Sequence, residues 1–253
     1  MSSSTGNTIG PMEALELVPP EILRFLIAGS KPSKAIEFDA GMSLVNLADD
    51  YERSCARDIA AELDDETLSR RRKVQLEDLM GAVRLSSVGH NSNTDSSNVS
   101  FRHLALLAQT KTDDAQVWHS LSMDENNPPS SVLIDRLKKM RTWINSPHFP
   151  DEMRIKIIDE PPLELLGDLS DDDGLVLANL TRMLNDCKWD VETIATCIVE
   201  SAKTIEKSPR IAYTVAYTCL MGSKKGPKLA PIIAELDKPK VIRQFERCLD
   251  CLN

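Results

Sequence analysis

Apolar residues recur at intervals of three and four along most of this chain, which places them on one face of an α-helix. Aromatic residues are scarce, at 4%, and a core of Leu, Ile, Val, Ala and Met favours packed helices over a β-sandwich. We therefore predict a mainly α fold. The stripes are Leu44, Leu47, Ala48, Tyr51, Cys55 and Ile59 in one long helix, then Leu133, Leu137, Met140 and Ile144, then Leu177, Leu180 and Leu184, then Ile194, Ile198, Ala202 and Ile205.

Turn-forming residues divide the end of the chain into short helices. Ser208 followed by Pro209 is typical of a helix start, and Gly222 of the stop of that helix. The Gly-Pro pair at 226–227 begins another helix, and Pro239 opens the last one. We predict five helices after residue 170, packed as a compact all-α module.

Two other stretches interrupt the helical pattern. Residues 86–100 are polar and aperiodic, which predicts a mobile surface loop. A double proline at 161–162 suggests a boundary, so we predict one part over residues 1–160 and a second over 161–253. The first part has room for one or two short strands near residues 36–39.

Charge is unevenly distributed. The formal net charge is −9, which argues against a protein that holds nucleic acid through bulk charge. Residues 161–202 hold nine acids and two bases, whereas residues 203–253 hold five acids and ten bases. A polyanion can dock on such a locally basic end, although a solvated helix face explains the same charges.

The sequence indicates a cytoplasmic protein. No apolar run approaches the length of a membrane span, and the first residues lack a signal-peptide pattern. Six cysteines fall mostly within helical patterns, which predicts reduced, buried thiols. The pair Cys248 and Cys251 has the spacing of two zinc ligands, but no second pair completes a site, so we predict no bound metal. The four histidines are scattered and define no catalytic site.

The N-terminal segment is rich in hydroxyl groups and small residues. Successive N–H groups and hydroxyls can donate hydrogen bonds to one phosphate, although a disordered tail has the same composition. The run MSSSTGNTIGP, from Met1 to Pro11, resembles the KMSKS loop of class I aminoacyl-tRNA synthetases, which is followed by Gly-Asn, an aliphatic residue and Pro. The segment after it, residues 14–27, resembles the helix pair that follows this loop.

Later segments resemble the lysyl class I group in particular. They are Lys-Pro at 31–32, IEFD at 36–39, and FRHL at 101–104 with Gln109 after it. The segment 220–227, with its Gly and Gly-Pro, is similar to a turn in the α-helix cage that is shared with bacterial-type glutamyl synthetases. The similarity spans most of the chain in order.

This resemblance implies the C-terminal half of a class I lysine–tRNA ligase, beginning inside the KMSKS loop. Residues 1–160 would form the end of that loop, the stem-contact region and connecting helices, and 161–253 an α-helix-cage anticodon-binding domain. The full enzyme would form lysyl-adenylate from ATP, with Mg²⁺ accompanying the ATP, and transfer lysine to lysine tRNA. Met1, Ser2, Ser3 and Ser4 would lie at the ATP phosphates.

Two departures limit what this half can do. The first motif lysine would precede Met1, and Ser3 stands where the motif has its second lysine. These lysines stabilise charge that develops on the phosphates. No complete catalytic set is present, and the Rossmann half with the HIGH motif is absent. We therefore expect no amino-acid activation by this chain alone, and a partner in the missing N-terminal half if that half is encoded separately.

Several basic and aromatic residues are candidates for binding the tRNA. Lys224, Lys225 and Lys228 lie near a helix start, where N–H groups also face an anion. Arg243 and Arg247 share one helix face, and the resemblance implies that they grip the anticodon arm through its phosphates. Base reading requires stacking or hydrogen bonding to unpaired nucleotides. Trp189, Tyr213 and Tyr217 could stack on such bases, yet each fits a helix core as well.

Three rival interpretations stay open. One is a free-standing tRNA-binding module, the non-catalytic remnant of a synthetase. Another is an interaction protein that has kept the fold but lost its RNA contacts. The third is a fragment of a glutamyl-type synthetase, because the helix cage is shared. We expect no DNA partner and no membrane partner.

Overall fold

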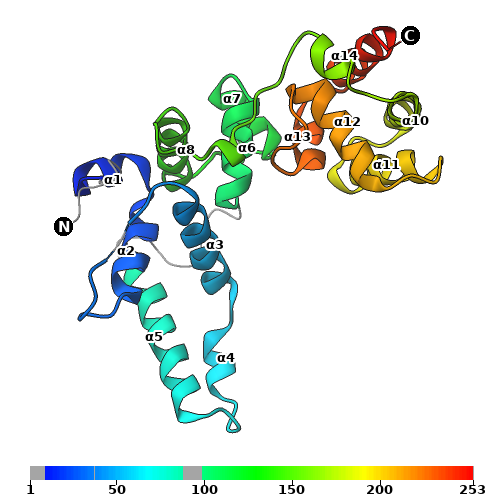
Figure 1. Ribbon diagram of the computed structural model, residues 1–253. Coiled ribbons are helices and arrows are strands. Elements are labelled where there is room, and N and C mark those ends of the chain that lie inside the picture. The colour runs from blue at the N-terminus through cyan, green and yellow to red at the C-terminus, as the bar shows by residue number, and fades with distance from the viewer. Residues whose placement is uncertain (1–8, 37, 88–98, 253) are drawn as a thin grey trace. The chain divides into compact units, whose positions relative to one another are not determined.

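The computed structural model describes residues 9–36, 38–87 and 99–252 (Figure 1). These residues form helices and no strand, so the mainly α prediction is confirmed. At 36–39, where the sequence allowed a short strand, the described residues are irregular, and Glu37 lies outside them. The chain divides into two compact units, residues 1–150 and 151–253, so the ten residues before the double proline pack with the second unit.

The first unit contains eight helices in its described residues, and α2 packs along α5 while α6 packs on α8 (Figure 1). Their bounds are α1 Pro11–Leu17, α2 Pro20–Gly29, α3 Met42–Ala56, α4 Ile59–Leu63, α5 Arg70–Ser86, α6 Phe101–Thr110, α7 Asp114–Ser120 and α8 Ser131–Ile144.

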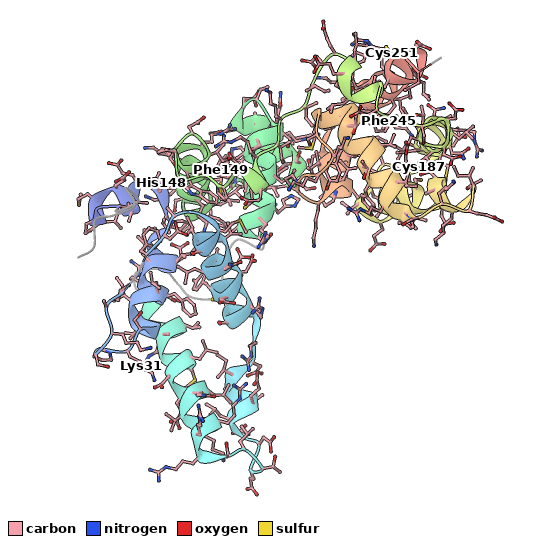
Figure 2. All side chains as sticks on the ribbon, viewed as in Figure 1. Lys31, His148, Phe149, Cys187, Phe245 and Cys251 are labelled. Atoms are coloured by element: carbon pink, nitrogen blue, oxygen red, sulfur yellow. The ribbon has the colours of Figure 1, made fainter. Side chains whose placement is uncertain are left out.

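Trp143 lies at the centre of the core that α6 and α8 share. It is fully buried, and its indole Nε1–H donates to the Ala40 carbonyl oxygen at 2.6 Å. The rings of Phe101 and Phe149 lie 5.3 and 4.7 Å from it, measured between centroids. One aromatic cluster thus fixes the end of α8 against α6 and the loop before α3, with the neighbouring His148 and Phe149 labelled in Figure 2.

The prediction of one long helix over residues 44–59 is wrong. The helix α3 ends at Ala56, and Arg57 has extended backbone angles. Asp58 then starts α4, because its carboxylate accepts a hydrogen bond from the Ala61 N–H at 3.0 Å, as N-cap residues do. The apolar spacing continues to Ile59 across this break, which is why periodicity alone suggested a single helix.

The predicted loop at 86–100 falls mainly on residues outside the description. Ser86 is still the last residue of α5, and Ser100 caps the start of α6, its hydroxyl accepting from the His103 N–H at 3.2 Å. Residues 88–98 lie outside the described part of the chain.

The second unit is a bundle in which α10 packs on α11, α12 and α14 (Figure 1). Its described residues form five helices after residue 170, as predicted, and Phe245 lies in the core. The bounds are η1 Asp151–Met153, α9 Leu163–Leu166, α10 Asp171–Asp186, α11 Val191–Lys203, α12 Pro209–Met221, α13 Leu229–Glu235 and α14 Lys238–Asp250.

The predicted starts and stops of these helices are close to those observed. Ser208 caps α12 with Pro209 in its first turn. Gly222 ends α12 in the left-handed region, at φ +60°, and its N–H donates to the Thr218 carbonyl at 3.1 Å. The Gly-Pro pair at 226–227 precedes the start of α13 at Leu229, and Pro239 is in the first turn of α14. By contrast, Ile205 lies beyond α11, which ends at Lys203.

The prediction of buried thiols holds for only part of the cysteine set. Cys197, Cys219 and Cys248 are buried and Cys187 is half-buried. Cys55 and Cys251 are exposed, which corrects the prediction for these two. Cys55 is the last residue but one of α3, and Cys251, labelled in Figure 2, is the C-cap of α14.

Candidate nucleic-acid interface

The residues that the resemblance places at ATP, Met1 to Ser4, lie outside the described part of the chain. The described continuation is apolar. Ile9 and Pro11 line a cavity of about 330 Å³ between α1, α2 and the residues Ile36 and Phe38. Among the described residues that line it, Arg24 alone is charged, and its Nε–H donates to the Ser86 carbonyl oxygen at 3.0 Å. The described lining of this cavity therefore holds no cluster of cations for phosphates.

A short irregular segment, residues 154–159, organises the candidate interface on the second unit. The Ile158 N–H donates to the carbonyl oxygen of Leu220, in the last turn of α12, at 3.0 Å. The Ile158 side chain lies against Gly222, such that a Cβ built on that glycine would be 3.6 Å from it. The segment is therefore fastened to the end of α12, with a depression on each side of it.

We call the depression on the side of α14 the α14 groove. It has a volume of about 210 Å³, and residues 157–159 face α14 across it. Its three cations come from successive turns of that helix: Lys240, Arg243 and Arg247. A spacing of three and four residues puts them on one helix face, so the predicted shared face of Arg243 and Arg247 also includes Lys240.

The opposite face of α14 explains why these cations point outward. Val241, Phe245 and Cys248 are buried on its inner side. Gln244 is also buried, and its Nε2 donates to the Cys219 carbonyl oxygen at 3.0 Å. This bond satisfies a carbonyl at the end of α12, which has no partner within its own helix, and it fixes the rotation of α14.

Asp159 is the anionic member of the α14 groove. Its carboxylate Oδ1 lies 2.8 Å from Lys240 Nζ, and its main-chain oxygen accepts a hydrogen bond from Arg247 Nη1 at 2.5 Å. The hydrogen bond and charge of Lys240, together with the charge of Arg247, hold the pKa of Asp159 below its usual value. Arg243 is exposed and has no ion-pair partner among the described residues.

We call the depression on the other side of the segment the turn pocket. It has a volume of about 500 Å³ and is lined by the cations Arg154, Lys156 and Lys225 and by the acids Asp151 and Glu152. Arg154 Nε lies 3.6 Å from the carboxylate of Asp151. Ser223, which also lines it, donates its hydroxyl to the Lys225 carbonyl at 2.7 Å and so shapes the turn after α12. Six cations therefore line the two depressions: Arg154 and Lys156 belong to the segment 154–159 itself, and Lys225, Lys240, Arg243 and Arg247 lie beside it.

The three lysines that the sequence grouped as one phosphate site point to different surroundings. Lys225 lines the turn pocket. Lys224 pairs with Asp168 at 3.2 Å, and both side chains are exposed. Lys228 is exposed and is the N-cap residue of α13. The structure thus separates Lys224 from the two basic depressions.

The aromatic candidates are held within the second unit. Trp189 is half-buried, its Nε1–H donates to the Leu236 carbonyl at 3.0 Å, and Lys238 Nζ lies 5.5 Å from its ring centroid. Tyr217 is buried and directs its hydroxyl at the carbonyl oxygens of Gly226 and Pro227. Burial raises its pKa. These contacts tie loops to the bundle, while Tyr213 is half-buried.

Sequence reasoning missed Lys240, Lys156 and Asp159. A signal existed for Lys240, because 240, 243 and 247 share one helical face. Asp159 and Lys156 gave no such signal, since their place beside α12 and α14 depends on tertiary contacts. In the described part of the chain, no group of three or more His, Cys, Asp and Glu residues is arranged to hold a metal ion. Nor does any described helix have the length and apolarity to cross a membrane.

Comparison with known proteins gives a consistent result. The family model described as tRNA synthetases class I (K) matches residues 1–79. The lysine–tRNA ligase of Thermoplasma volcanium is 28% identical over 251 residues, which cover 98% of this chain and 46% of that protein. Those of Methanopyrus kandleri and Pyrococcus horikoshii are 28% and 26% identical, over 99% and 97% of this chain and 45% and 46% of theirs. The chain thus spans about half the length of these relatives, and its resemblance to class I lysine–tRNA ligases is confirmed.

Proposed function

We propose that this chain, a relative of class I lysine–tRNA ligases along nearly its whole length, is the tRNA-binding C-terminal part of such an enzyme. The whole enzyme would form lysyl-adenylate from ATP and lysine, then transfer the lysine to the terminal ribose of lysine tRNA. Residues 1–160 would supply the end of the ATP loop and the stem-contact region. Residues 161–253 would supply the anticodon-binding helix cage, with the preceding segment 154–159 forming part of its surface.

The observation that carries this proposal is the pair of basic depressions along residues 154–159. Lys240, Arg243 and Arg247 line one of them, and Arg154, Lys156 and Lys225 line the other. Contacts to phosphates supply most of the affinity of a protein for nucleic acid and fix its position. The two depressions together hold six cations and three acids, Asp151, Glu152 and Asp159. This surface is therefore locally basic on a chain of net charge −9, and it attracts a polyanion more than the chain as a whole does.

Within this proposal the cations bind and orient the tRNA, and the described residues take no part in the chemistry of activation. The described lining of the cavity beside Ile9 and Pro11 is apolar with one guanidinium, and these residues do not fit a triphosphate with its Mg²⁺. The resemblance assigns ATP to Met1–Ser4 and to the half that this chain does not match. We propose that the chain alone does not activate lysine and that its partner is that nucleotide-binding half. Its place of action is the cytoplasm.

Binding of purified tRNA to the full chain tests the proposal. We expect lysine tRNA to bind at 50 mM salt and to lose at least tenfold in affinity at 200 mM, as several phosphate contacts require. Lysine tRNA should bind more tightly than glutamate tRNA, whereas the reverse order would favour the glutamyl alternative. Equal and negligible binding of tRNA and of duplex RNA at low salt would contradict the proposal and favour an interaction protein.

A reconstitution experiment separates the synthetase half from a free-standing tRNA module. The nucleotide-binding half of the Thermoplasma volcanium ligase would be mixed with this chain, and charging of lysine tRNA measured. Each half alone serves as the control, with no activity expected. Restored charging supports the proposed role, and tRNA binding without any restored charging would favour the non-catalytic module.

A further inference from the structure

We propose that the carboxylate of Asp159 occupies the position of an RNA phosphate in the α14 groove and is displaced when RNA binds. Asp159 would then act as a built-in competitor that weakens RNA binding. This inference rests on the proposed RNA-binding function and adds to it a residue that regulates access to the groove.

The carboxylate of Asp159 contacts one of the three cations that a bound phosphate would meet in the groove. Lys240 Nζ lies 2.8 Å from its carboxylate, and Arg247 donates to its main-chain oxygen at 2.5 Å. Arg243 lies between these two cations along α14, lines the same groove, and has no ion-pair partner in the described part of the chain. The groove, at about 210 Å³, has several times the roughly 30 Å³ share of one liquid water, which is room for a phosphate group.

The ion pair between Asp159 and Lys240 is one that a phosphate can break. The two side chains are 76% and 58% exposed, and exposed pairs contribute little to stability. An RNA phosphodiester carries the same single charge and two anionic oxygens as the carboxylate, and the RNA adds the charges of its neighbouring phosphates. RNA can therefore contact Arg243 and Lys240 together, whereas the Asp159 carboxylate pairs with Lys240 alone.

The backbone around Asp159 allows the side chain to leave without unfolding the groove. The preceding residue, Ile158, is fastened through its N–H to the Leu220 carbonyl oxygen. The exposed carboxylate can therefore rotate into solvent about its own side-chain bonds while the main chain stays in place. The cost of displacement is then limited to one exposed ion pair.

An alternative role for Asp159, in which it positions Lys240 for RNA, predicts the opposite result. If the carboxylate held Lys240 in the correct position for RNA, its removal would weaken binding. If it competes with phosphate, its removal strengthens binding, because a negative charge no longer occupies the groove. The sign of one substitution therefore distinguishes the two roles.

The substitution is Asp159→Asn, which retains the size of the side chain and the main-chain oxygen that Arg247 binds. The matched control is Asp186→Asn on α10, an exposed residue with no ion pair among the described residues. It changes the net charge equally. Both full-length variants and the unmodified chain would be titrated with lysine tRNA at 50 and 200 mM salt, after a melting curve has verified folding.

We expect Asp159→Asn to bind about three- to tenfold more tightly than Asp186→Asn, the size of one charge interaction across roughly 5 Å at a wet surface. A second measurement repeats the comparison in a Lys240→Gln background. In that background the gain in affinity from Asp159→Asn should shrink, because Lys240, the cation that pairs with Asp159, has been removed. A general charge effect would leave the gain in affinity unchanged.

The possible failures are distinct. If the unmodified chain binds tRNA but Asp159→Asn gains no more than the control, or binds more weakly, the inference is overturned and the proposed function stands. If the gain persists in full without Lys240, the competition at this cation is also excluded. If none of the proteins binds tRNA, the proposed function fails and this inference fails with it.

Discussion

The N–H of Ile158 donates to the carbonyl oxygen of Leu220 at 3.0 Å, and this bond fastens the segment 154–159 to the last turn of α12. The bond gives a partner to the Leu220 carbonyl, which at the C-terminal end of α12 has none within the helix. The segment runs between α14 and the turn after α12. The same bond therefore places Asp159 beside Lys240 in the α14 groove, and it places Lys156 beside Lys225 in the turn pocket. The candidate interface therefore depends on how α12 ends.

Gly222 provides the first test of that ending. Its φ of +60° is in the left-handed region, which costs an L-residue about 1–2 kcal/mol. A Cβ would meet Ile158 at 3.6 Å, which is an ordinary contact, so the penalty comes from the backbone. We expect Gly222→Ala to lower the unfolding free energy of the second unit by about 1 kcal/mol, and Gly222→Asn to lower it less, as measured by urea denaturation. Equal stability of Gly222→Ala and the parent chain would contradict this.

Trp143 tests the core of the first unit. Replacing it with Phe removes the donor to the Ala40 carbonyl and leaves space beside Phe149. We expect a loss of about 2–3 kcal/mol, the sum of a lost buried hydrogen bond and a partly filled cavity. Trp118→Phe, at a half-buried position on α7, is the control and should cost less than half as much. The prediction fails if the two variants unfold at the same urea concentration.

The Glu21–Arg136 pair tests the value of a buried charge contact. Arg136 Nε lies 2.7 Å from Glu21 Oε1, and the side chains are only 13% and 5% exposed. Removing one partner of a buried pair costs about 3–5 kcal/mol, because the other charge stays buried. We expect Glu21→Ala to cost about 3 kcal/mol. Asp50→Ala, which breaks the exposed pair with Arg53, should cost at most about 1 kcal/mol, and a similar cost for both would exclude a special role for burial.

Asp190 predicts part of the acid sensitivity of the second unit. The Thr193 N–H donates to its carboxylate at 2.9 Å, and this bond, followed by that from Lys188, lowers the pKa of Asp190 to about 2. A carboxyl whose pKa is lower in the folded than in the unfolded state stabilises the fold above its unfolded pKa. That contribution is lost as the pH falls from about 4 to 2.

We therefore expect Asp190→Asn to flatten the fall in stability over that range. The measurement is the urea midpoint at pH 5 and at pH 3, compared between the variant and the parent chain. An equal fall in both proteins would show that another group controls acid unfolding.

Helix ends were predictable from the sequence wherever the signal was local. Ser208 before Pro209 and Gly222 at the end of α12 act through their own backbone conformation, so single residues revealed them. The break before α4 was missed because the apolar spacing runs on from Cys55 to Ile59, while the decisive contact is the cap that Asp58 forms with Ala61.

The candidate site was predictable only where it lies on one helix. The shared face of Arg243 and Arg247 follows from their spacing. Asp159, however, is 88 residues from Arg247 along the chain, and no local pattern brings them together. Trp189 likewise bonds to Leu236, 47 residues away, which sequence alone did not reveal. Contacts between distant segments decide both positions.

The proposed binding of RNA phosphates in the α14 groove is tested most directly by the salt dependence of tRNA binding when the groove loses its cations. In the triple variant Lys240→Gln, Arg243→Gln, Arg247→Gln, we expect weaker binding and a plot of log affinity against log salt that is less steep by about two to three. The matched control removes three exposed cations of the same unit that line neither depression, Arg182→Gln, Lys203→Gln and Arg210→Gln, and should leave the slope unchanged. An unchanged slope and affinity in the α14 variant would contradict the account.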